Sequence, residues 1–127
     1  MKQKILVQFD DKSITLELDD SHSPKTVESF LNSLPFDTTL NVWGEEIYTS
    51  SSPINAGLEN AKSPVNLNDV AYWPTGKAIC LFYGETPMGK KGEITPASPV
   101  NVIGKILEPD KSVIDSAEGK IGKFSKL

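Results

Sequence analysis

The sequence contains no arginine, and its thirteen basic residues are all lysines. It has a single histidine and a single cysteine, too few ligands for a four-coordinate zinc site. One cysteine excludes an internal disulfide and is typical of a reducing compartment, so we expect a cytoplasmic protein without a metal or other cofactor. No apolar run is long enough for a membrane span or a signal peptide, and the net charge of −4 disfavours nucleic acid as a partner.

Short alternating segments dominate the chain. With 127 residues and 38% hydrophobic content, it fits one globular domain over residues 1–127. Residues 4–10 and 13–19 alternate apolar and polar side chains around a turn, which predicts a β-hairpin. The strand pattern returns at 38–50, 70–73, 78–84 and 100–108, with Gly44 expected at a bulge or a close approach. Residues 119–127 could form a final strand or a frayed end. The balance favours a mainly β, closed antiparallel barrel with a helix over one opening.

A helix is predicted over residues 24–33. Ser23 is a suitable N-cap, Pro24 suits the first helical position, and Pro35 ends the segment. The helix should bury one apolar stripe, Val27, Phe30, Leu31 and Leu34, against barrel residues such as Leu6, Leu16 and Ile103.

Two parts of the chain resemble cyclophilins. The stretch "SHSPKTVESFLNSLP" is similar to the proline-started helix of that family, and "VNVIGKILE" is similar to a later strand. The stretches "WGEEIY", "NDVAYWPTGKAICLFYG" and "ASPVNVIGKI" resemble a group of small cyclophilin-like proteins of archaea and bacteria whose function is uncharacterised. The resemblance implies a barrel of eight antiparallel strands, with one or two short helices capping its ends.

The catalytic residues of cyclophilins are not carried over. Cyclophilins catalyse rotation about the peptide bond before proline. The resemblance implies that this catalysis uses an arginine on the strand after the first helix. Here that stretch offers Asn41, Val42 and Trp43, and lysine lacks the planar fork of donors that arginine has. We therefore assign no catalytic residue and do not expect prolyl isomerase activity.

The stretch "VAYWPTGKAICLFYG", residues 70–84, raises the question of a binding site. Its aromatic residues could fill the core, but tyrosine and tryptophan often lie where an apolar surface meets water. Glu46 and its neighbour Glu45 point to opposite faces of a regular strand, so they should not share a proton. We predict a shared pocket of at least ~300 Å³. Its candidate ligand-binding residues are Trp43, Glu46, Tyr48, Tyr72 and Trp73.

The remaining residues of that stretch have structural interpretations. Pro74, Thr75 and Gly76 predict a tight turn, with glycine free to take a positive φ. Cys80 is expected to be a buried, unreactive thiol.

Three classes of function stay open at this point. The favoured one is a binding module that takes a small molecule or a short extended peptide, neutral or cationic, in an aromatic-lined groove. The second is an enzyme, either a weak or divergent prolyl isomerase or one that uses Glu46 or Tyr48 as acid or base. The third is a purely structural or interaction protein whose groove is covered by its own loop or by a second subunit. The sequence does not decide between a monomer and a homodimer.

Overall fold

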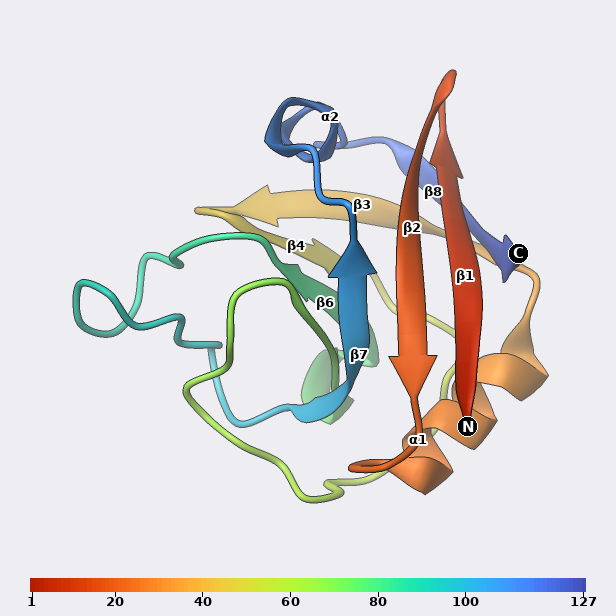
Figure 1. Ribbon diagram of the computed structural model, residues 1–127, viewed down its shortest axis with the longest axis horizontal. Coiled ribbons are helices and arrows are strands. Elements are labelled where there is room, and N and C mark those ends of the chain that lie inside the picture. Colours follow the sequence, from red (N-terminus) through yellow and green to blue (C-terminus); the bar gives the residue numbers. More distant parts are fainter.

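The computed structural model describes residues 1–127, whose eight strands close into an antiparallel barrel (Figure 1). This confirms the prediction of a mainly β, closed barrel. The order around the barrel is β1-β2-β7-β5-β6-β4-β3-β8. The strands are β1 (Lys2–Phe9), β2 (Lys12–Asp19), β3 (Phe36–Trp43), β4 (Glu46–Thr49), β5 (Asp69–Trp73), β6 (Ala78–Phe82), β7 (Asn101–Leu107) and β8 (Ile121–Lys126). The helices are α1 (Pro24–Ser33), the 3₁₀ turn η1 (Pro74–Gly76) and α2 (Lys111–Asp115).

Alternation along each strand separates a buried inner face from an outer face. In the hairpin of β1 and β2, Val7 lies opposite Ile14 and both point into the barrel. Leu6 is half-buried and falls on the outer face between two inward residues, Ile5 and Val7, so the prediction that it packs inside was wrong by one position. The inward side chains form one hydrophobic core of 21 buried residues.

Helix α1 covers one end of the barrel, and α2 lies at the other end (Figure 1). Val27 and Phe30 of α1 are fully buried, whereas Leu31 and Leu34 are only partly buried against the same core. Phe30 lies edge-on to Phe124 of β8, with ring centroids 6.2 Å apart. The apolar stripe of the helix thus closes the barrel core.

The N-terminus of α1 is capped from a distant loop and not by Ser23. The Ser23 side chain makes no capping bond and donates to the carbonyl oxygen of Glu59. The Glu59 carboxylate accepts from the backbone N–H groups of Lys25, at 3.0 Å, and Thr26, at 2.9 Å. Asn101 of β7 accepts from the N–H of Glu59 at 2.8 Å and so ties this loop to the barrel. The cap satisfies otherwise unpaired helix donors and places a negative charge at the positive end of the helix.

Two long loops, residues 50–68 and 83–100, run together over the outer face of the barrel wall. Short antiparallel bridges join Lys62 to Val100 and Val65 to Ile94. Beneath them lies a second hydrophobic cluster, which we call the outer cluster. It consists of Val65, Ala71, Cys80, Phe82, Ile94 and Val100.

Three local features either differ from the sequence-based expectation or decide between alternatives that the sequence left open. Gly44 takes a φ of +61° in the turn between β3 and β4, so residues 38–50 form two strands and not one bulged strand. The close approach expected at Gly44 is confirmed, because a Cβ there would lie 2.7 Å from Cδ of Pro87. The C-terminal segment forms β8, which pairs with both β1 and β3 and so closes the barrel. The helix α2, whose position the sequence did not indicate, is capped by the side chain of Asp110.

None of the helices has the length and apolar character required to span a bilayer.

Candidate functional site

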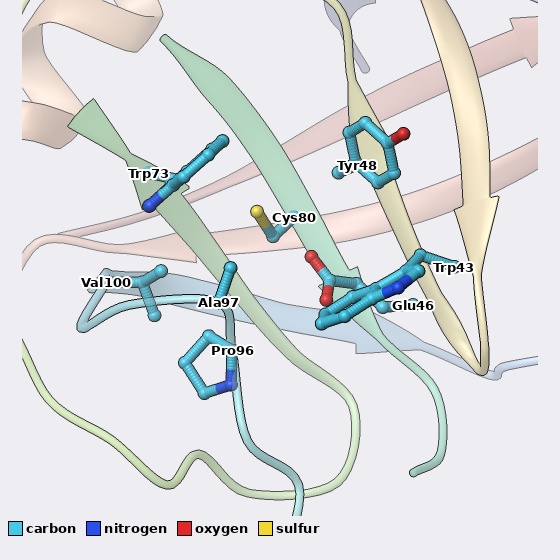
Figure 2. Close-up of a pocket in the computed structure, with 8 residues that line it drawn as sticks. All are labelled: Trp43, Glu46, Tyr48, Trp73, Cys80, Pro96, Ala97 and Val100. Carbon is cyan, nitrogen blue, oxygen red and sulfur yellow. The ribbon is translucent and has the colours of Figure 1, made fainter. Parts of the chain in front are cut away.

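A hollow of about 260 Å³ opens on the outer face of the barrel, between strands β3 to β6 and the second long loop (Figure 2). It is slightly smaller than the ~300 Å³ at the lower end of small-molecule pockets, and smaller than predicted. Most of its lining is apolar. The lining residues are Trp43, Glu46, Tyr48, Trp73, Cys80, Pro96, Ala97 and Val100.

Strand pairing brings five of these residues together. Trp43 at the end of β3 lies opposite Glu46 at the start of β4, and Tyr48 of β4 lies opposite Cys80 of β6. Trp73 ends β5, which pairs with the other edge of β6. Since side chains two positions apart share a face, Glu46 and Tyr48 both point outward while Ile47 between them is fully buried in the core. Figure 2 shows the two indoles on opposite sides of Cys80 and Glu46.

Tyr72 does not belong to this group, which corrects the predicted site. It points into the barrel, is 0% exposed, and donates its hydroxyl to the carbonyl oxygen of Ile54 at 2.8 Å. Tyr48 lies on the other side of the wall and is 38% exposed. The site that Tyr48 and Tyr72 were predicted to share therefore does not exist. Alternation along β5 sends Tyr72 inward and its neighbour Trp73 outward.

Four lining residues had not been predicted. Cys80 is buried, as expected for a structural thiol, but it lies on the outer face and forms part of the floor of the hollow. Pro96, Ala97 and Val100 come from the loop that folds over the wall. Nothing in the local sequence pattern of this loop indicates that it returns to β4 and β6.

The turn after β5 holds Trp73 in place. Its indole N–H donates to the Ser98 hydroxyl. This bond links β5 to the second long loop, residues 83–100, which we call the covering loop. Residues Pro74 to Gly76 form the predicted turn, but the positive φ of 50° falls on Lys77 and not on Gly76. Gly76 is needed for a different reason, because a Cβ there would lie only 2.7 Å from the Trp73 ring.

Comparison with known proteins assigns the family. The cyclophilin-like family model matches residues 3–122. The chain belongs to the cyclophilin-like family. None of the curated proteins compared with it matches.

One solved structure of a relative covers almost the same length. The hypothetical protein AF2241 from Archaeoglobus fulgidus, known from a solution structure, is 37% identical to this chain. The match covers 99% of this chain and 95% of that one, with a TM-score of 0.83.

In this cyclophilin-like chain, the stretch where the resemblance implied a catalytic arginine has other contacts. The Asn41 side chain donates to the backbone oxygen of Tyr48 at 3.2 Å, across the hairpin of β3 and β4. Val42 is partly buried against the core, and Trp43 lines the hollow. None of the eight lining residues is a lysine. The hollow thus offers aromatic faces and a carboxyl group, and no basic side chain lines it.

Glu46 supplies the one carboxyl group in the lining of the hollow. Glu46 is only 4% exposed, and its Oε1 atom has no hydrogen-bond partner. Burial raises the pKa of Glu46 to about 7, and the Cys80 thiol beside it offsets part of that rise. The carboxyl group therefore exists in both protonation states near neutral pH, which is the range suited to a pH-dependent contact with a ligand.

The surroundings of Cys80 oppose formation of its thiolate. Burial, followed by the charge of Glu46, raises the pKa of its thiol well above the usual value. A thiol becomes reactive when positive charge and exposure stabilise the thiolate, and here both conditions are reversed. Cys80 is better described as a small apolar part of the floor.

Proposed function

We propose that this cyclophilin-like protein is a binding module that takes a small molecule or a short peptide in the outer hollow, without catalysing prolyl isomerisation. One observation carries the proposal. An apolar hollow bounded by two indoles is lined by Glu46, one of whose carboxyl oxygens is buried without a hydrogen-bond partner. Buried polar atoms in folded proteins nearly always have a partner, so an unpartnered one on a residue that lines a hollow supports a role for Glu46 in contacting a ligand.

The remaining features of the hollow fit recognition better than chemistry. Rigid aromatic side chains offer a large contact area at a low entropy cost, and one polar group is enough to orient a ligand. The hollow lacks the arginine that cyclophilin-type catalysis would use, and its thiol is held in the unreactive form. The single cysteine supports a cytoplasmic location as part of the same proposal.

The chain contains two tryptophans, and both line the hollow. Ligands can therefore be found by following tryptophan emission and the two indole N–H resonances during a screen of small molecules and short peptides. We expect at least one class of compound to shift both indole signals in a saturable manner. If every compound leaves both signals unchanged, the proposed function is wrong.

A matched pair of variants tests whether the hollow is the binding site. Ala97 lies on the exposed side of the lining, so Ala97→Phe should fill the hollow and abolish the response while the protein stays folded. Leu58 is exposed at 73% and does not line the hollow, so Leu58→Phe is the control and should bind normally. Equal binding by both variants would place the ligand elsewhere.

A further inference from the structure

The Oε1 atom of Glu46 identifies what the ligand must supply. The atom is buried and accepts no hydrogen bond from the protein. Leaving such an acceptor without a partner is unfavourable, and more so when the group is charged. The neighbouring carboxylate of Glu45 is not available to share a cation, because it pairs with Lys111 at 3.0 Å. A ligand that donates an N–H to Glu46 would remove the penalty.

The aromatic walls favour the same kind of ligand. The faces of tryptophan and tyrosine attract cations, most strongly where water is excluded. Trp43 lies beside the Glu46 carboxyl group, Trp73 lies across the hollow beyond Cys80, and Tyr48 lies at the edge (Figure 2). A cation in this space would meet both an aromatic face and a carboxylate, whereas an anion would be repelled by Glu46.

We propose that the hollow binds a small organic ammonium ion, with an N–H of the ion donated to Oε1 of Glu46 and its carbon atoms packed between Trp43 and Trp73. This inference rests on the proposed function, because it assigns the chemical class of ligand for the same hollow. A primary, secondary or tertiary ammonium fits, since each keeps at least one N–H. The apolar lining from Pro96, Ala97 and Val100 would cover the carbon skeleton.

Binding of such a cation would be linked to the release of a proton. Only the ionised form of Glu46 forms the ion pair, and burial keeps about half of these groups neutral at pH 7. The other titratable groups that line the hollow are the Cys80 thiol of β6 and the Tyr48 phenol of β4. Trp43 of β3, Trp73 of β5 and the covering loop add no titratable side chain to the lining. The pH dependence of cation binding should therefore follow Glu46.

Four compounds that share a cyclohexyl ring test the inference. Their affinities for the full chain are measured through tryptophan emission. Cyclohexylammonium, cyclohexanol and cyclohexanecarboxylate differ in charge, and cyclohexyltrimethylammonium keeps the charge without an N–H. At pH 8 we expect cyclohexylammonium to bind at least about tenfold more tightly than cyclohexanol, the carboxylate not to bind, and the quaternary ion to bind more weakly than cyclohexylammonium. For a Glu46 pKa of about 7, the affinity for cyclohexylammonium should fall about tenfold between pH 8 and pH 6.

Glu46→Gln provides the matched variant. It should lose the preference for cyclohexylammonium and its pH dependence, while both indole signals still respond to cyclohexanol, which shows that the hollow is intact. If cyclohexanol binds the wild type as tightly as cyclohexylammonium, or if Glu46→Gln keeps the preference, the inference is overturned while the proposed binding function stands. Tighter binding of the quaternary ion would overturn the hydrogen bond to Oε1. The pH profile of the wild type gives an independent result should the variant fail to fold, and an unchanged affinity from pH 6 to pH 8 contradicts the role of Glu46.

Discussion

The indole ring of Trp73 lies directly against Gly76, three residues later in the chain. A Cβ added to Gly76 would fall 2.7 Å from Cζ3 and 2.8 Å from Cε3 of the ring. The ring cannot rotate away without losing the hydrogen bond from its N–H to Ser98 of the covering loop. The turn that ends β5 therefore sets the position of one wall of the hollow.

Replacing this glycine should move Trp73. We expect Gly76→Ala to shift tryptophan emission, to weaken any ligand of the hollow several-fold, and to lower the free energy of unfolding by about 1–2 kcal/mol through overpacking. Indole N–H spectra and urea denaturation measure these effects. Gly57→Ala is the control, since a Cβ at Gly57 meets nothing within 4 Å, and its stability should change by no more than about 0.5 kcal/mol. Identical behaviour of the two variants would contradict the contact.

The buried carboxyl group of Glu46 should make the protein less stable as the pH rises. Its pKa is raised from 4.5 in the unfolded chain to about 7 by burial, so the folded state holds its proton more tightly. The folded protein binds more protons between these two values, and stability falls with increasing pH over that window. The advantage of Glu46→Gln over the wild type should grow by about 2–3 kcal/mol between pH 5 and pH 8.

Urea denaturation at the two pH values measures this difference. Glu28→Gln, a change at an exposed position of α1, controls for the general loss of one negative charge. A constant difference between Glu46→Gln and the wild type across the pH range would show that Glu46 is ionised normally in the folded state.

The protein should not accelerate isomerisation of a peptide that contains Ala-Pro. The barrier to rotation is about 18–20 kcal/mol, and losing one preorganised donor typically costs about 3 kcal/mol of catalysis. With no arginine in the chain, we expect the rate at micromolar protein to equal the spontaneous rate in a protease-coupled assay, with an active cyclophilin as positive control. A rate increase that disappears in Trp43→Ala would overturn this expectation.

Removing the cap of α1 should destabilise the barrel. Glu59→Ala leaves the N–H groups of Lys25 and Thr26 without their partner, and we expect a loss of about 1–2 kcal/mol at pH 7. Although partial burial opposes it, the bonds from Thr26 and Lys25 lower the pKa of Glu59. The contribution of a carboxylate with a lowered pKa is present above its unfolded value and is lost as the pH falls through its folded value.

The effect of Glu59→Ala should therefore be smaller at pH 3 than at pH 7, as measured by urea denaturation. Glu28→Ala, on the exposed side of the same helix, is the control. Equal losses at both pH values would show that packing, and not the charge on the cap, accounts for the effect.

Local signals in the sequence were enough to predict α1, because a proline at the start and an apolar stripe do not depend on distant residues. Alternation also explains why Glu46 and Tyr48, two residues apart in β4, share a face. It could not say which face of β5 points inward, because Tyr72 and Trp73 are both large aromatic residues in an apolar strand. The cap by Glu59 and the covering loop were not predictable, since each joins segments more than thirty residues apart: Thr26 to Glu59, and Glu46 to Pro96.

The barrel wall divides the apolar residues into an inner core and a separate outer cluster, and this division bears on how the family can diverge. Substitutions of Trp43 or Ala97 alter only the outer surface, while the inner packing that closes the barrel is left intact. Side chains around the hollow can thus change at little risk to folding. Sequence drift should accordingly be fastest in the loop that bears Ala97 and slowest among inward residues such as Leu16 and Ile103.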